Sequence, residues 1–284
     1  MIKTRNVKFR DAKSREMFNE RKVICFDKDG VLVDISELTY FNRRNAFEHI
    51  GREFPYDSET IYKLGGISAR YNSGMQQILA IMAFERWHEG HSYTNAKVKD
   101  TLRKLILSPD ASSTLDMIVS KYQTNEDTEK AKVAYAWHGK KMLTIEEASM
   151  YIKPIKGSRD AIFNIKELMK GNVAIITNTP SIEIVTRDLL LAGFSRNDIN
   201  SLRIITNAKK PSPERVKETL ENFKTNPTEA AYVGDSVIDS RTARNSGVLS
   251  VLVLSGMGTK EALSRSNPDV IAKNIKDLSE ALRR

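Results

Sequence analysis

The sequence predicts an α/β protein with a doubly wound parallel sheet and an inserted all-helical domain. Short apolar runs are typical of buried parallel strands. They lie at about 22–26, 172–177, 202–206, 230–234 and 249–254, with an edge piece near 269–272. Helical patterns alternate with these runs at about 157–170, 180–193, 212–223, 238–246 and 275–283. This alternation of strand and helix is what predicts the doubly wound sheet.

The chain between residues 35 and 153 has a different pattern, with no convincing pair of strands. Helical patterns cover about 36–50, 68–89, 95–107, 111–123, 127–138 and 144–152. We therefore expect residues 1–34 and 154–284 to form the α/β core domain and residues 35–153 to form a helical domain. Hinges are expected near Val33–Ser36 and Lys153–Gly157. Residues 5–20 are expected to form a short polar helix before the first strand.

The charge distribution favours an anionic substrate. The chain has 45 basic and 36 acidic residues, a net charge of +9, but residues 35–153 hold 16 basic and 15 acidic residues. The positive excess therefore lies on the predicted core, where its field would attract anions. The sequence has no block of five or more Lys and Arg residues and no interleaved aromatic stripe. We therefore expect no nucleic-acid partner.

Other features of the composition predict a cytoplasmic protein. No apolar run approaches the roughly 18 residues that a membrane span needs, and the basic N-terminal stretch lacks the apolar segment of a secretory signal. The one cysteine, Cys25, excludes an internal disulfide framework and fits a reducing compartment. We interpret Cys25 as a small hydrophobe buried in the first strand, with a catalytic thiol as the alternative.

Two acidic residues follow the first predicted core strand. In VICFDKDGVLVD, residues 23–34, the strand leads directly into Asp27 and Asp29. Groups just beyond the carboxyl ends of parallel strands lie in the crevice where such sheets bind ligands. The like charges repel unless a cation or a shared proton compensates them. Magnesium is the expected cation, since it prefers a few carboxylate oxygens together with phosphate oxygens.

Polar residues also follow two later strands and one loop. Thr177 and Asn178 end the strand in NVAIITNTPS, and Asp235 and Asp239 follow the strand in EAAYVGDSVIDS. Between them, the loop NAKKPSPE carries two adjacent lysines, of which we favour Lys210 because it precedes Pro211. Acids, a hydroxyl group and a lysine are the groups that phosphoryl transfer requires.

These four motifs together resemble those of the haloacid dehalogenase superfamily, specifically its phosphatase branch. The resemblance covers residues 22–34 and 154–272 and is much weaker between them. It implies that Asp27 is a nucleophile forming an aspartyl-phosphate and that Asp29 is the general acid and base. It also implies that Asp27, the Asp29 carbonyl and Asp235 bind Mg²⁺. Asp239 is expected to hold Lys210 or to contact the metal.

The resemblance extends to the phosphate site and to the cap. It implies that Thr177 and Asn178 bind the transferring phosphoryl group. The superfamily's dehalogenases lack an acid at the position of Asp29, so this residue favours a phosphatase. The helical insertion resembles a cap domain of the phosphoglycolate-phosphatase type, although it is larger than a compact four-helix cap. Within it, Gly66 and Arg70 are our candidates for substrate contact.

We therefore predict a magnesium-dependent phosphatase that acts on a small phosphorylated metabolite through an aspartyl-phosphate. A phosphomutase with the same chemistry is the first alternative, and a non-catalytic binding protein on this fold is the second. The sequence determines neither the substrate nor the oligomeric state.

Overall fold

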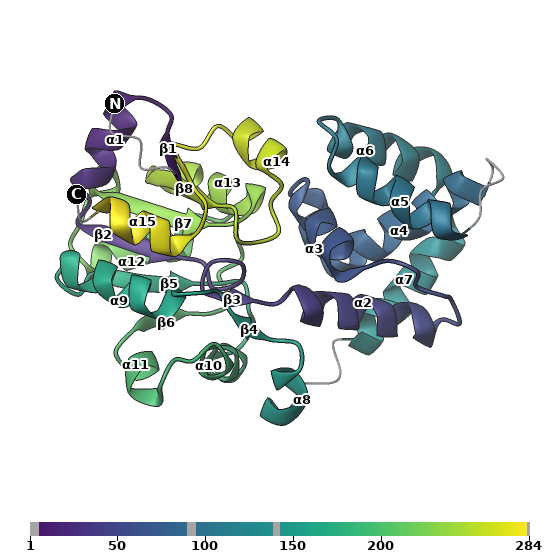
Figure 1. The fold of residues 1–284 in the computed structure, drawn as a ribbon, viewed down its shortest axis with the longest axis horizontal. Coiled ribbons are helices and arrows are strands. Elements are labelled where there is room, and N and C mark those ends of the chain that lie inside the picture. Colours follow the sequence, from purple (N-terminus) through teal and green to yellow (C-terminus); the bar gives the residue numbers. More distant parts are fainter. Residues whose placement is uncertain (1–5, 90–94, 139–142, 283–284) are drawn as a thin grey trace. The chain divides into compact units, whose positions relative to one another are not determined.

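The computed structural model describes residues 6–89, 95–138 and 143–282, and the chain divides into two compact units (Figure 1). The α/β unit contains the described parts of Met1–Ile35, Ile152–Gly256 and Leu263–Arg284. The helical unit contains Ser36–Tyr151 and also Met257–Ala262. We expected residues 257–262 to belong to the core. They are assigned to the helical unit, in which the Lys63 ammonium donates to the Gly258 carbonyl at 3.3 Å.

The predicted doubly wound sheet is confirmed. Its strand order is β1-β9-β8-β7-β2-β5-β6, and every neighbouring pair except β1–β9 is parallel. The chain leaves β2 in one direction through β5 and β6, then returns to its other side through β7, β8 and β9. In sheet order the strands are β1 (Val7–Phe9), β9 (Val270–Ala272), β8 (Leu249–Val253), β7 (Ala230–Gly234), β2 (Val23–Phe26), β5 (Val173–Ile176) and β6 (Arg203–Ile205).

Helices cover both faces of the sheet (Figure 1). The α9 helix packs with α15, and α12 packs with α13. The apolar core under α12 and α13 includes Val23, Cys25, Ala174 and Tyr232, all buried. The helices of the unit are α1 (Ala12–Asn19), α9 (Ser158–Leu168), α10 (Ile182–Leu191), α11 (Arg196–Asn200), α12 (Glu214–Asn222), α13 (Val237–Ser246) and α15 (Ile275–Leu282), with the 3₁₀ turn η2 (Pro227–Glu229). Helix α14 (Lys260–Arg265) begins in the helical unit's segment and ends in the α/β unit.

Two short strand pairs were absent from the sequence prediction. The expected polar helix over residues 5–20 is wrong at its start, because Val7–Phe9 forms an antiparallel edge strand against β9, and only α1 is helical. A second pair, β3 (Val33–Asp34) with β4 (Lys153–Pro154), lies where we expected the two hinges. Two-residue strands carry too little pattern to be recognised, so only the partner strand reveals them.

The helical unit is built around α4. Its core includes Leu79, Ile81, Phe84 and residues of the surrounding helices, all buried. The predicted continuous helix over 68–89 is wrong, since the Gln77 amide donates to the Tyr71 carbonyl at 2.9 Å and α4 begins only at Gly74. Its elements are α2 (Ser36–His49), α3 (Ser58–Gly66), η1 (Arg70–Asn72), α4 (Gly74–Glu89), α5 (Asn95–Ile106), α6 (Ala111–Tyr122), α7 (Asn125–His138) and α8 (Ile145–Ser149). No helix among the described residues is long and apolar enough to cross a bilayer.

A buried carboxyl group makes the stability of this unit depend on pH. The Glu85 side chain is 13% exposed, and it accepts hydrogen bonds from Arg52 at 2.7 Å and Tyr56 at 2.9 Å. Burial raises the pKa of Glu85 to about 7, although Arg52 and Tyr56 oppose the rise. A folded-state pKa above the unfolded one contributes stability at low pH, and this contribution is lost between about pH 4.5 and pH 7.

We therefore expect Glu85→Gln to stabilise the helical unit at pH 8, by about 1–3 kcal/mol on the scale of 1.36 kcal/mol per pKa unit, and to have little effect at pH 4.5. Unfolding by denaturant should be followed by tryptophan fluorescence, because both tryptophans, Trp87 and Trp137, belong to this unit. The control is Glu129→Gln, whose carboxylate is exposed on α7. Equal effects at the two pH values would contradict the prediction.

Candidate active site

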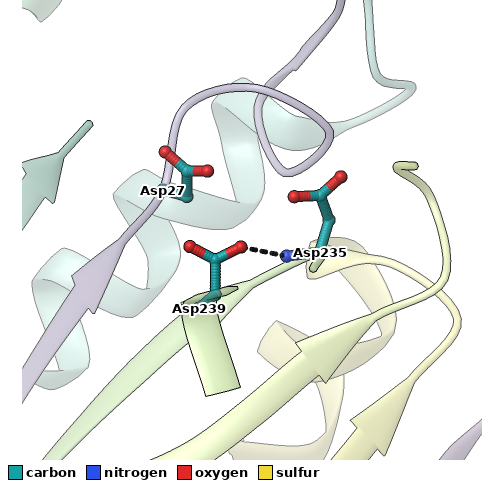
Figure 2. A group of neighbouring side chains, drawn as sticks. All are labelled: Asp27, Asp235 and Asp239. Atoms are coloured by element: carbon teal, nitrogen blue, oxygen red, sulfur yellow. Dashed lines mark hydrogen bonds between the residues drawn. The ribbon is translucent and has the colours of Figure 1, made fainter. Parts of the chain in front are cut away.

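Three buried aspartates meet at the carboxyl ends of β2 and β7. Asp27 follows β2, Asp235 follows β7, and Asp239 lies in the first turn of α13 (Figure 2). One carboxylate oxygen from each lies within 4.8 Å of the others. The chain changes direction across the sheet between these two strands, which is where open α/β sheets bind ligands.

Asp27 is held by two donors. Its Oδ1 accepts the backbone N–H of Lys28 at 2.7 Å, and its Oδ2 lies 2.8 Å from the Lys210 ammonium. Burial raises the pKa of Asp27 to about 7. The Lys210 charge lowers it, whereas Asp239 and Asp29 raise it further. Asp27, Asp235 and Asp239 are buried together beside the ammonium of Lys210, so a bound cation would favour the ionised Asp27.

Lys210 is the central cation of the cluster. Its buried ammonium lies 2.7 Å from Asp239 and 2.8 Å from Asp27, and its backbone N–H donates to the side chain of Asn178 at 2.8 Å. Burial alone would lower the pKa of Lys210, but the two carboxylates outweigh it and the net pKa is well above its usual value. The neighbouring Lys209 is exposed, so the choice of Lys210 agrees with the geometry.

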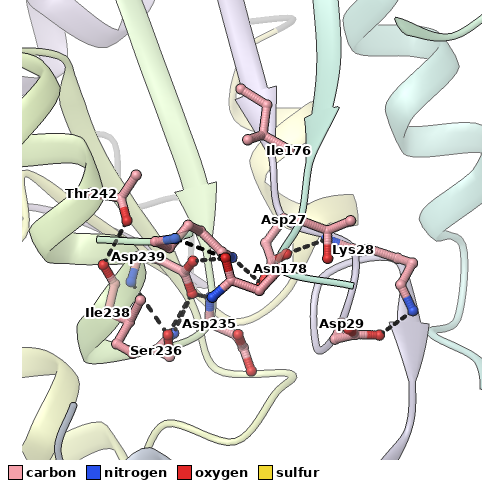
Figure 3. Close-up of polar contacts among 12 residues, drawn as sticks. Asp27, Lys28, Asp29, Ile176, Asn178, Asp235, Ser236, Ile238, Asp239 and Thr242 are labelled. Atoms are coloured by element: carbon pink, nitrogen blue, oxygen red, sulfur yellow. Dashed lines mark hydrogen bonds and ion pairs between the residues drawn. The ribbon is translucent and has the colours of Figure 1, made fainter. Parts of the chain in front are cut away.

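Both carboxylate oxygens of Asp239 have protein donors. Oδ1 contacts Lys210, while Oδ2 accepts from the backbone of Asp235 at 3.2 Å and from Ser236, through its backbone at 3.0 Å and its hydroxyl at 2.6 Å (Figure 3). This is also the capping box of α13. Of the two roles expected for Asp239, the contacts favour holding Lys210 over binding a metal directly.

The carboxylate of Asp235 lies between two glycines. A Cβ atom on Gly30 would lie 2.1 Å from Asp235 Oδ2, and one on Gly256 would lie 1.9 Å from the same atom. Any side chain at either position would therefore displace this oxygen. With Asp27 nearby, the site presents buried oxygen ligands in an excess of negative charge. This donor set suits Mg²⁺.

Thr177 and Asp29 are connected through a residue that we did not predict. The buried Thr177 hydroxyl lies 3.2 Å from the Thr179 hydroxyl, which in turn donates to Asp29 Oδ2 at 3.4 Å. The other oxygen of Asp29 lies 2.5 Å from the Lys28 ammonium. The residues expected from three strand ends and the lysine loop thus come together within the α/β unit.

The comparison with known families identifies this arrangement. The family model of haloacid dehalogenase-like hydrolases matches residues 21–247. The chain belongs to this family. Among relatives, it is 31% identical to the phosphoglycolate phosphatase of Vibrio parahaemolyticus over 111 residues, which is 39% of this chain and 48% of that protein. It is 34% identical to that of Photorhabdus laumondii over 119 residues, or 40% of this chain and 50% of that protein.

The chain thus spans about half the length of these phosphatases, whereas solved structures match it almost throughout. A candidate phosphoglycolate phosphatase from Lactobacillus delbrueckii has a TM-score of 0.62 at 20% identity, covering 92% of this chain and 98% of that one. A predicted phosphoglycolate phosphatase from Haemophilus somnus has a TM-score of 0.57 at 17% identity, covering 92% and 97%. At these identities the similarity establishes the haloacid dehalogenase fold.

Sequence analysis missed Lys28 and Asp188. The side chain of Lys28 is 1% exposed, and its ammonium lies 2.5 Å from both Asp29 and Asp188. Asp188, on α10, is also paired with the guanidinium of Arg187 at 2.7 Å. Lysine is almost never fully buried unless it is paired. The only sequence signal for this pairing was a lysine placed between two acids at the end of a buried strand.

The two candidates in the helical unit make contacts within that unit. The Arg70 guanidinium lies 2.9 Å from Asp116 and remains 44% exposed, so a substrate anion would compete with Asp116 for it. Gly66 is the last residue of α3 and does not lie in a flexible turn. A Cβ atom on Gly66 would lie 2.1 Å from the Met257 carbonyl oxygen. The need for glycine at position 66 is explained by this close approach. Their roles in substrate binding stay predictions.

Cys25 behaves as the small hydrophobe that we expected. It lies within β2, is fully buried, and has its thiol pKa raised to about 12 by burial. A thiol with so high a pKa forms little thiolate at neutral pH, so it is a poor nucleophile.

Proposed function

We propose that this protein is a magnesium-dependent phosphatase for a small phosphorylated metabolite, with Asp27 as the nucleophile. The observation that carries the proposal is the cluster in which Lys210 bridges Asp27 and Asp239 beside Asp235. Such a cluster combines a nucleophilic carboxylate, a buried cation and oxygen ligands for a metal. Membership of the haloacid dehalogenase-like hydrolases supports the same chemistry.

The metal would be held by the carboxylates of Asp27 and Asp235 and by the backbone carbonyl of Asp29. When bound, Mg²⁺ supplies positive charge that reduces the repulsion between a carboxylate and a phosphate dianion. The grouping of three buried carboxylates beside Lys210 is consistent with this need.

In the first half of the proposed reaction, a carboxylate oxygen of Asp27 attacks phosphorus. The bond between phosphorus and the substrate's ester oxygen breaks as the aspartyl-phosphate forms. Asp29 gives its proton to the departing oxygen, because an alkoxide is a poor leaving group. The Lys210 ammonium and the hydroxyl of Thr177 offset the charge on the phosphoryl oxygens.

In the second half, the ionised Asp29 takes a proton from a water molecule as that water attacks phosphorus. The bond between phosphorus and Asp27 breaks, inorganic phosphate leaves, and Asp29 is protonated for the next cycle. One carboxyl group can therefore serve both half-reactions.

The test is a screen for phosphate release from phosphoglycolate, sugar phosphates, nucleoside monophosphates and an aryl phosphate. We expect release from at least one alkyl phosphate with Mg²⁺, and loss of at least about 100-fold after chelation. Asp235→Asn should raise the magnesium concentration that gives half-maximal activity. Asp160→Asn, an exposed site on α9, is the matched control.

Other outcomes would identify the alternatives. Isomerisation of a sugar phosphate without phosphate release would identify a phosphomutase. Tight binding without turnover of any compound would favour a non-catalytic binding protein. Phosphate release that survives chelation would contradict the proposed role of magnesium. The cytoplasmic location and the cap function of the helical unit stay predictions.

A further inference from the structure

A chain of alternating charges runs through the α/β unit behind the proposed catalytic acid. The Arg187 guanidinium contacts Asp188 Oδ1 through two nitrogens, at 2.7 and 3.0 Å. The other oxygen of Asp188 lies 2.5 Å from the Lys28 ammonium, which lies 2.5 Å from Asp29 Oδ1 (Figure 3 shows the last contact). Lys28 and Asp188 are almost fully buried, whereas the Asp29 side chain is partly exposed.

Lys28 contacts both acids of the motif. Its backbone N–H donates to Asp27 Oδ1 at 2.7 Å, and its ammonium holds Asp29 Oδ1. An ammonium on a flexible stem is free to contact any nearby carboxylate. Here Asp188 Oδ2 holds it toward α10, while Arg187 contacts the other oxygen of Asp188.

The contacts of the two Asp29 oxygens differ in strength. Oδ1 has a short contact with a charged donor, which is the stronger kind of hydrogen bond. Oδ2 has a 3.4 Å contact with the Thr179 hydroxyl, close to the limit for a hydrogen bond. The geometry therefore distinguishes an anchored oxygen from a weakly held one.

We propose that Lys28, held in place by Asp188, is a positioning residue that fixes the Asp29 carboxyl group so that Oδ2 exchanges the proton with the substrate's leaving oxygen. This inference rests on the proposed phosphatase function. It assigns a role to Lys28, which lies between the two acids of the first motif, and to Asp188, which lies outside the four motifs, and it explains why a lysine is buried between two acids. The role is orientation, since Lys28 acts only through Asp29.

The decisive experiment is a double-mutant cycle between Lys28→Met and Asp29→Asn. Formation of the aspartyl-phosphate should be measured in single turnovers, with an alkyl phosphate and with an aryl phosphate. We expect Lys28→Met to slow the step roughly 10- to 100-fold for the alkyl phosphate and less than about 3-fold for the aryl phosphate. The loss for the alkyl phosphate should be only part of the roughly 100- to 10,000-fold that general acid catalysis contributes, because Asp29 itself is still present. In the Asp29→Asn background, Lys28→Met should have almost no further effect.

Asp188→Asn gives a second way to release the lysine without changing the motif. Asp188→Asn should also slow aspartyl-phosphate formation more for the alkyl phosphate than for the aryl phosphate, but its loss for the alkyl phosphate should be smaller than that of Lys28→Met. This variant keeps the inference testable if Lys28→Met folds poorly. Lys22→Met is the matched control, because Lys22 precedes the same strand and pairs at the surface with Glu229. The inference would be overturned if the rate losses of Lys28→Met and Asp29→Asn multiplied in the double variant. It would also be overturned if Lys28→Met slowed the step equally for the two substrates.

A structural readout separates this inference from the proposed function. Crystal structures of the wild type and of Lys28→Met should show one orientation of the Asp29 carboxyl group in the former and a different or divided one in the latter. The same single orientation in both would overturn the positioning role, whether or not any phosphate ester is hydrolysed. Absence of turnover in the wild type would instead count against the phosphatase.

Discussion

Asp27→Asn should lower phosphate release by roughly 10,000-fold or more, the scale seen when a nucleophile is removed. The amide has nearly the shape of the carboxyl group but is a poor nucleophile toward phosphorus. The fold should survive, because burial already raises the pKa of Asp27 to about 7 and the site accommodates a neutral group. Metal-free Asp27→Asn should therefore be at least as stable as the wild type at pH 8.

Two measurements check this prediction. Turnover should be followed on freshly purified protein, and acid quenching with labelled substrate should trap phosphate on wild-type Asp27 but not on the variant. The exposed Asp160→Asn again serves as the control for an amide substitution elsewhere. Full activity in the Asp27 variant would falsify its assignment as the nucleophile.

Lys210→Met should affect both activity and stability. Loss of the ammonium removes the charge that offsets Asp27, Asp239 and the phosphoryl group, so turnover should fall by about 100- to 1,000-fold, the scale of one lost oxyanion donor. It also leaves two buried carboxylates without their cation. Removing one partner of a buried ion pair costs about 3–5 kcal/mol.

The stability loss should grow with pH. Lys210 lowers the pKa of Asp27, so without it that pKa rises above its wild-type value of about 7. A raised folded-state pKa contributes stability below the unfolded value and loses it as the pH rises through the folded one. The variant should therefore approach the wild type near pH 5 and fall furthest below it above pH 7.

Denaturation in chelator at pH 5 and pH 8 measures this difference. The adjacent Lys209→Met is a closely matched control, because it removes the same charge from the same loop at an exposed position. We expect Lys209→Met to retain activity and stability at both pH values. If the two lysine variants behaved alike, the ion pairs of Lys210 would have no special role.

The sequence was sufficient to predict the core of the α/β unit. Its central strands, β2, β5, β7 and β8, are short, apolar and buried, so each appears as a continuous run whose end is marked by a change to polar residues. Those ends also predicted that Asp27, Asp235 and Lys210 would lie together, because parallel strands present their carboxyl ends at one edge. The structure brings the three residues together as expected.

Local pattern failed where an element depends on a distant partner. Val7–Phe9 is a strand because it pairs with β9. Helix α3, which no predicted helix covered, ends at Gly66, where the Met257 backbone lies close. The break before α4 was also missed, since Gln77 replaces a helical hydrogen bond with one from its own side chain. The partners of Val7–Phe9 and Gly66 are distant in sequence, whereas Gln77 lies six residues after Tyr71 and acts through a side-chain contact that the helical pattern does not show.

The sequence by itself determined which acids follow the strands of this haloacid dehalogenase-like hydrolase and which loop carries the lysine. Only the tertiary structure decided how their charges are balanced. Lys28 is buried because Asp188, 160 residues away in the chain, lies 2.5 Å from its ammonium, and Asp239 faces Lys210 because α13 begins beside it. Ion pairs depend on distance and burial, and neither quantity can be read from the order of residues.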